Sequence, residues 1–186
     1  VLAAATLFVF SAIWGPVGGV YWRTMRKRKQ QRDTDRQHLL RAIYEFLEWK
    51  GDAPQPYGQS RSATFDLKQI GALQSWSTWR LFRSTRGLLK EGRLLLIEPQ
   101  GYRLSVKGIQ DSLRAVRQHR LLELYFSRMA DLSADAIDRG ADYSEHALDD
   151  EMLAALERDT QLAGLEGSVP RSLHPIDWSS SNRKET

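Results

Sequence analysis

The chain has no cysteine among its 186 residues. This absence excludes disulfide bonds, thiolate-based zinc fingers and every metal site that needs cysteine sulfur. A metal bound by this chain must therefore be held by carboxylate oxygen, imidazole nitrogen or similar ligands. A reducing compartment fits the same absence.

Motifs for catalysis are also missing. The sequence has no nucleophile elbow, no glycine-rich phosphate loop and no HExxH zinc motif. It has only 4 histidines, and they form no convincing catalytic set. We therefore predict that the protein is not an enzyme.

Charge is missing from residues 1–22, VLAAATLFVFSAIWGPVGGVYW. About 20 consecutive apolar residues span a bilayer core as a helix, so we predict a transmembrane helix over this stretch. A secretory signal is disfavoured because no basic stretch precedes the apolar core. A buried soluble helix and a single-span anchor are alternatives. Pro16 and the pair Gly18-Gly19 favour the last helix of a multi-span protein, packed against other helices.

Acidic residues are missing from residues 23–32, RTMRKRKQQR, whereas residues 131–160 are rich in Asp and Glu. This asymmetry indicates one half that faces a polyanion and another that binds a cation. We interpret residues 23–35 as a basic juxtamembrane linker that fixes topology and contacts anionic lipid. The positive-inside rule then places residues 23–186 in the cytoplasm, at the inner (cytoplasmic) membrane.

Apolar periodicity predicts a mainly α fold with a winged helix-turn-helix domain over residues 36–107. The first helix, over residues 36–49, is amphipathic, and residues 51–64 form a loop rich in Gly, Pro and Ser. A short helix over residues 65–73, a turn at 74–75, a third helix over 76–91 and a β-hairpin around Pro99-Gln100-Gly101 follow. Three helices and a hairpin within about 70 residues are typical of a winged helix. The expected core residues are Leu39, Leu40, Ile43, Phe46, Leu47, Leu81, Leu88 and Leu89.

The third predicted helix offers polar and basic side chains to DNA. Small polar residues near its start can reach base edges, and arginines can reach phosphate or guanine. The alternative is an exposed basic helix that faces an acidic partner or membrane headgroups. The candidate DNA-binding residues are Ser77, Thr78, Trp79, Arg80, Arg83 and Arg86.

After the hairpin, residues 108–163 are predicted to form a helical domain, with helices near 106–129 and 134–147 and a third from Asp149. The tail, residues 164–186, is polar and is predicted to be flexible.

Acidic and imidazole side chains share one face on each of the first two of these helices. On the first helix their spacing is i, i+4, and on the second it is i, i+4, i+7 and i+8. Carboxylates with imidazole and without thiolate suit Mn²⁺ or Fe²⁺, with Zn²⁺ and Co²⁺ as alternatives. The competing interpretation is a solvated acidic face with an incidental histidine. The residues concerned are His119 and Glu123 on the first helix, and Asp138, Asp142, Glu145 and His146 on the second.

The stretch RQHRLLELYFSRMADLSADAIDRGADYSEHALDDEM resembles the metal-binding and dimerisation domain of the iron- and manganese-dependent repressors, the diphtheria-toxin-repressor family. The shared features are the HRLLE segment, a Leu-Ser turn and a helix that ends in Glu-His before an acidic cap. The preceding winged helix is similar in order and spacing, from RAIYEFLE through LLKEGRLLL to GYRLSVKG. The resemblance covers roughly residues 36–160.

The resemblance implies two metal sites. Glu145 and His146 match the paired ligands, Asp142 stands where the family has Cys or Glu, and His38 stands where it has Met or Asp. The ancillary site is matched by His119 and Glu123, with Asp138 where some members have His. Arg41 stands where manganese-selective members have a Glu ligand. This departure counts against a two-ion manganese cluster without making the site iron-specific.

The resemblance further implies a metal-dependent transcriptional regulator of the Mn/Fe-responsive repressor type. The metal would link the first helix of the winged domain to the metal-binding domain, so that a homodimer binds a double-stranded DNA operator only when metal is present.

The apolar helix before this domain makes the chain similar to the end of a metal-uptake ABC transporter permease fused to a repressor-type domain. The partners would then include the membrane, through residues 1–22, the remaining permease and its ATPase subunit. The alternative function is a cytoplasmic metal-sensing domain that regulates divalent metal transport by the permease without binding DNA. A membrane-anchored structural winged helix without metal is a third hypothesis.

Overall fold

The computed structural model describes residues 20–54, 63–73, 76–99, 101–129, 133–144, 150–159 and 169–173. The chain divides into two units, Val1–Asp35 and Arg36–Thr186, and the helix α2 (Val20–Trp49) includes residues of both. The helix begins at Val20, whereas the apolar periodicity predicted a start at residue 36. Residues 23–35, predicted as a linker, are helical because they contain no Gly or Pro and are rich in the strong helix formers Arg, Lys and Gln.

Within the described ranges, no helix combines the length and the apolar character that crossing a membrane requires. The predicted transmembrane segment, residues 1–22, lies outside the described residues except for its last three, which begin α2. The membrane helix therefore stays a prediction.

The second unit opens with the predicted winged helix. The last part of α2 is followed by α3 (Leu67–Leu73), α4 (Thr78–Lys90) and an antiparallel hairpin of β1 (Leu94–Ile97) and β2 (Gly101–Leu104). Helix α4 begins at Thr78 because the Ser77 side chain caps it by accepting a hydrogen bond from Arg80 N at 3.3 Å. The predicted turn at residues 74–75 and most of the predicted loop, residues 55–62, lie outside the described residues.

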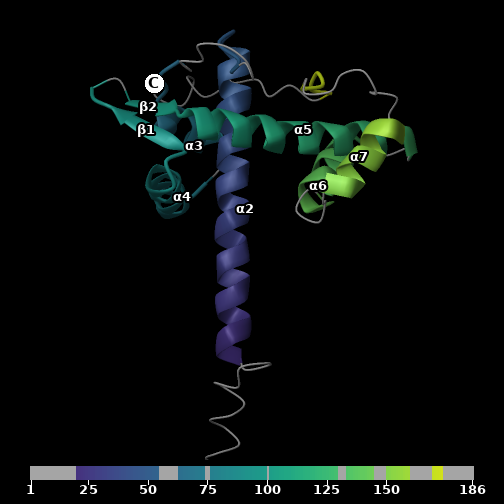
Figure 1. Cartoon of the computed structure of the whole chain (residues 1–186), viewed down its shortest axis with the longest axis horizontal. Helices are drawn as coiled ribbons and strands as arrows, with labels where there is room; N and C mark the ends of the chain where they lie inside the picture. Colours follow the sequence, from purple (N-terminus) through teal and green to yellow (C-terminus); the bar gives the residue numbers. More distant parts are fainter. Residues whose placement is uncertain are drawn as a thin grey trace, which may run out of the picture. The chain divides into compact units, whose positions relative to one another are not determined.

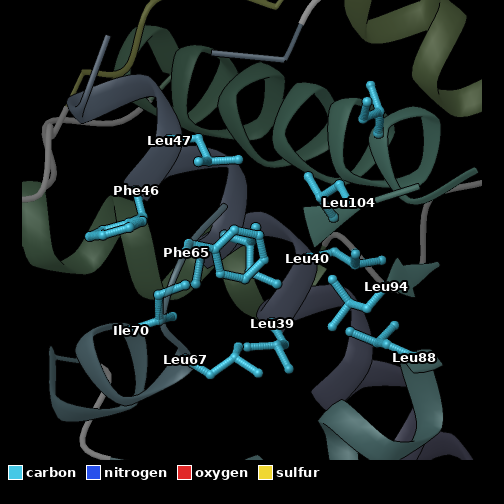
Figure 2. Close-up of a cluster of buried hydrophobic side chains, with 13 residues drawn as sticks. Leu39, Leu40, Phe46, Leu47, Phe65, Leu67, Ile70, Leu88, Leu94 and Leu104 are labelled. Atoms are coloured by element: carbon cyan, nitrogen blue, oxygen red, sulfur yellow. The ribbon is translucent and has the colours of Figure 1, made fainter. Parts of the chain in front are cut away.

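The core of the winged helix forms around the apolar face of α2. The five residues predicted for that face, from Leu39 to Leu47, are all buried, and they meet side chains from α3, α4 and both strands (Figure 2). Leu88 is buried as predicted, whereas Leu81 and Leu89 pack against the cluster only partly buried. The apolar periodicity therefore predicted the centre of this core correctly.

A long helix, α5 (Val106–Met129), follows the hairpin, and α6 (Ala134–Ser144) and α7 (Asp150–Asp159) pack against it. The hairpin lies at one end of α5, and α6 and α7 lie at the other (Figure 1). A second, smaller core of Leu122, Ala141 and Leu156 joins these three helices. The expected starts of α5 and α6 agree with the structure, and residues 145–147 of the second predicted helix lie outside the described residues.

Part of the predicted flexible tail contacts α5. Residues 169–173 are described, and Pro170 is buried. Its carbonyl oxygen accepts a hydrogen bond from Arg120 Nη1 at 2.8 Å. A buried guanidinium on α5 therefore contacts the backbone of this segment, and the flexibility of residues 164–186 stays a prediction.

The hairpin and the first turn of α5 are tightly packed against each other where Ser105 and Gly108 meet the end of α4 and the start of β1. Ser105 Oγ donates a hydrogen bond to Gly92 O at 2.6 Å and accepts one from Gly108 N at 3.0 Å. A Cβ atom on Gly108 would lie 2.0 Å from Arg93 O. Only glycine lets the first turn of α5 approach the wing this closely.

We expect Gly108→Ala to lower the free energy of unfolding by about 1–3 kcal/mol, the usual cost of overpacking, despite the higher helix propensity of alanine. Urea unfolding followed by circular dichroism measures the change. Gly87→Ala is the matched control, because its Cβ would meet only the flexible end of the Arg36 side chain. Equal stability of the two variants would show that the contact between the hairpin and α5 is not tightly packed.

Candidate metal centre

One group of metal-capable side chains lies between α5 and α6 in the part of the chain that the structure describes. It consists of His119, Asp138 and Asp142, whose ligand atoms all lie within 4.8 Å of one another. His119 Nε2 is 3.2 Å from Asp138 Oδ1, and His119 Nδ1 is 3.4 Å from Asp142 Oδ1. The two helices thus face each other with carboxylate and imidazole groups, as their spacing predicted.

Glu123 extends this group along α5. Its Oε1 lies 3.3 Å from His119 Nε2, and both side chains are buried. Its other oxygen, Oε2, is buried without a hydrogen-bond partner among the described residues. A buried carboxylate oxygen without a partner is costly, and a cation beside it would supply the missing interaction.

The donor set fits the predicted type of metal. Carboxylate oxygens and one imidazole, with no thiolate, suit Mn²⁺ or Fe²⁺ and admit Zn²⁺ or Co²⁺. His119, Glu123, Asp138 and Asp142 are the described residues that would hold such an ion.

A side chain from the winged helix already reaches into this group. Arg41, on α2, is only 7% exposed. Its Nη1 lies 2.6 Å from Asp142 Oδ1 and 2.5 Å from His119 Nδ1. The sequence marked Arg41 only as a departure from a ligand position, and it gave no sign of this contact with α5 and α6.

Glu45, one turn further along α2, is a second residue that the sequence analysis missed. Burial raises the pKa of its carboxyl group above the ordinary value, although the Arg41 charge opposes the shift. Its Oε1 lies 3.9 Å from Arg41 Nε, and its Oε2 is buried without a hydrogen-bond partner among the described residues. The i, i+4 spacing of Arg41 and Glu45 was the available signal, because it puts both groups on one face of α2.

A second arginine also joins α2 and α5, but it lies on α5 and its partner lies on α2. Arg120, on α5, is 2% exposed and binds both carboxylate oxygens of Glu48 on α2. Its guanidinium also lies 5.9 Å from the centre of the Tyr44 ring. Burial alone would lower the pKa of Arg120, but the hydrogen bond and charge of Glu48 raise it above its ordinary value. The guanidinium therefore stays charged, and the ion pair persists.

Of the remaining predicted metal ligands, the structure describes only His38. His38 is half-buried on α2 and does not belong to the group of three. Glu145 and His146, the paired ligands implied by the resemblance, lie outside the described residues. The described part of the chain therefore brings Asp142 together with the residues of the ancillary site. The roles of His38, Glu145 and His146 stay predictions.

The predicted DNA-binding residues lie at the start and along the outer side of α4. Ser77, Thr78, Trp79 and Arg86 are exposed, whereas Arg80 and Arg83 are half-buried. The Arg80 guanidinium stacks over the Trp76 ring, 4.3 Å from its centre. Arg80 is therefore less available to bases or phosphates than the sequence suggested.

An exposed aromatic pair also lies on α4. Trp79 is 68% exposed and Phe82 is 55% exposed. Their rings are stacked with centroids 6.0 Å apart. Phe82 was not predicted as a functional residue, and its place three residues after Trp79 was the available signal.

Comparison with known proteins agrees with this arrangement. Residues 105–161 match the family described as "Iron dependent repressor, metal binding and dimerisation domain". The structure titled "Structure of the manganese regulator SloR" is similar with a TM-score of 0.54 and 22% identity, over 76% of this chain and 62% of that chain. The structure titled "Crystal structure of T. acidophilum IdeR" gives 0.55 and 20%, over 74% of this chain and 63% of that chain. No curated protein matches the sequence.

The similarities to solved structures establish the fold. The solved structures share the fold, and the chain spans less than two thirds of the length of either one. Residues 105–161 are similar to the metal-binding and dimerisation domain of iron-dependent repressors. The predicted cofactor class, a divalent transition metal, is thereby confirmed. Fusion to a permease finds no support in these similarities and stays a prediction.

We expect Glu123→Gln to weaken Mn²⁺ binding at least tenfold, because loss of even an outer-shell partner of a metal ligand typically costs about 10–100-fold. Isothermal titration calorimetry on the full chain measures the affinity. Asp111→Asn is the matched control, since Asp111 is another acid on α5 but pairs with Arg93. Equal affinities in the two variants would exclude Glu123 as a ligand.

Proposed function

We propose that the chain is a metal-dependent, DNA-binding transcriptional regulator of the Mn/Fe-responsive repressor type. The observation that carries the proposal is that one helix, α2, contacts both the core of the winged helix and the carboxylate–imidazole group. Helix α2 provides the core of the winged helix through one face, and through Arg41 it contacts the carboxylate–imidazole group on α5 and α6. Occupancy of that group is thereby coupled to the position of the winged helix.

The metal would be held by His119, Glu123, Asp138 and Asp142, with Glu145, His146 and His38 as further ligands. A bound divalent ion supplies positive charge that neutralises the clustered carboxylates and draws their helices together. His119 orients the group, because its two ring nitrogens face different carboxylates.

Helix α4 would be the recognition helix, and the hairpin β1–β2 would be the wing. The exposed polar residues Ser77 and Thr78 stand at the helix start, where recognition helices contact base edges. Arg86 is exposed further along and suits phosphate contact. A homodimer would present two such helices to an operator, and the family matched by residues 105–161 is described as a dimerisation domain.

The alternative function is metal-dependent regulation of an attached permease without DNA binding, at the cytoplasmic membrane. The observation that favours it is the exposed aromatic pair Trp79–Phe82 on α4. Large exposed aromatic residues are enriched at protein–protein contacts, and α4 would then dock on protein rather than on DNA. Residues 1–22 would supply the membrane attachment in this proposal.

Selection from a random double-stranded DNA library tests the main proposal with the full chain. We expect one sequence class to be enriched with Mn²⁺ and lost when a chelator is added. Enrichment of no sequence, with Mn²⁺ binding intact, would contradict DNA binding and favour the alternative.

On the selected DNA, we expect Arg86→Ala to weaken binding severalfold and to lower the salt dependence of the affinity, because each protomer would lose a phosphate contact. Fluorescence anisotropy over a series of salt concentrations measures the affinity. Arg114→Ala is the matched control, because it removes the same charge from the exposed surface of α5. An equal loss in both variants would mean that net charge, rather than α4, binds the DNA.

A further inference from the structure

Arg41 places a positive charge beside two side chains of the metal group, Asp142 and His119. Its Nη1 is within 2.6 Å of a carboxylate oxygen of Asp142 and within 2.5 Å of His119 Nδ1. Both residues belong to the group that is otherwise fit to hold an ion. A guanidinium therefore takes the side of the site that faces α2.

The contact with His119 also determines which ring nitrogen carries the proton. A guanidinium has donors and no acceptor, so His119 Nδ1 must accept from Arg41. In the neutral ring the hydrogen is then on Nε2, where it is directed toward Asp138 Oδ1 and Glu123 Oε1, at 3.2 and 3.3 Å. A protonated Nε2 has no lone pair for a metal, and a ligating histidine instead donates from its other nitrogen to a carboxylate or carbonyl.

Removal of the guanidinium would reverse both effects. Asp142 would lose its cation, and Nδ1–H could then donate to Asp142 Oδ1, which lies 3.4 Å away. Nε2 would become a ligand beside Glu123 and Asp138. The displaced guanidinium has a carboxylate near it on its own helix, because Glu45 Oε1 lies 3.9 Å from Arg41 Nε. The other oxygen of Glu45, Oε2, is buried without a hydrogen-bond partner among the described residues.

We propose that Arg41 is a resident cation that holds the winged helix to α5 and α6 without metal. We propose further that it competes with the metal by holding Asp142 and by keeping the His119 proton on Nε2, the nitrogen that would otherwise bind the ion. The competition rests on the proposed metal-dependent function. The tautomer of His119 and the arginine link are properties of the metal-free chain and do not rest on it.

The tautomer is tested in the full chain with ¹⁵N-labelled histidine, in chelator at neutral pH, by long-range ¹H–¹⁵N correlation spectra. The His119 signals are identified by their loss in His119→Gln. We expect the Nε2–H tautomer in the unaltered chain and in Arg41→Lys, which keeps a donor and a positive charge. Arg41→Met, which has neither, should shift His119 toward Nδ1–H. An Nδ1–H or doubly protonated ring in the unaltered chain would overturn the proposal without any variant.

The competition is tested by calorimetric titration of Mn²⁺ into the same proteins. We expect Arg41→Met to bind Mn²⁺ at least tenfold more tightly than the unaltered chain, and Arg41→Lys to bind like it. Arg120→Met is the matched control, because it removes a buried guanidinium that joins the same two helices outside the metal group. Its affinity should not rise.

The outcomes separate this proposal from the proposed function. Unchanged or weaker Mn²⁺ binding in Arg41→Met, with binding intact in the unaltered chain, overturns the competition alone. A similar rise in Arg120→Met also overturns it, because loosening of the helices would then explain the gain. Absence of Mn²⁺ binding in every protein overturns the metal-dependent function and the competition together, and the spectra still decide the arginine link.

Discussion

Two buried guanidinium groups tie the first helix of the winged domain to the helices that carry the metal group, and the rest of the second unit depends on that connection. Arg41 reaches from α2 to α5 and α6, and Arg120 reaches back from α5 to Glu48 on α2. Burial of charge has a large desolvation cost, so such pairs add little net stability compared with apolar packing. However, any arrangement of the helices that leaves one buried charge without its ion-pair partner is strongly disfavoured. The two arginines therefore specify how α2 lies against α5 more than they strengthen the fold.

This connection explains how events at the metal group can reach the surface of α4. The apolar face of α2 forms one core with α4 and the hairpin, and close-packed interiors transmit displacement because they cannot compress. The polar face of the same helix carries Arg41 and Glu45. A change in the partners of Arg41 would therefore act on a helix that packs into the core of the winged domain. The Ser105–Gly108 joint provides a second, backbone connection between the wing and the start of α5.

The sequence predicted what depends on local periodicity and left open what depends on tertiary placement. The buried face from Leu39 to Leu47, the hairpin and the facing acidic sides of α5 and α6 all follow from spacing along one element. The contact of Arg41 with Asp142 joins residues 101 positions apart, and no periodicity encodes such a pairing. The early start of α2 was missed because the charge of residues 23–35 was interpreted as a sign of a linker, although their helix propensity is high. The anchoring of Pro170 depends on a single distant arginine and was likewise invisible.

A resident arginine changes what the metal group responds to. A site with an empty cation position binds any suitable divalent ion with the full attraction of its carboxylates, and repulsion among those carboxylates destabilises the metal-free state. A guanidinium beside those carboxylates would relieve the repulsion and keep the metal-free arrangement ordered. The binding free energy of the ion must then outweigh the free energy of the Arg41 contacts that it breaks. A higher ion concentration is therefore needed for binding. Arg41 would thus give the carboxylate cluster a threshold for metal binding, because the ion must overcome the contact between Arg41 and Asp142.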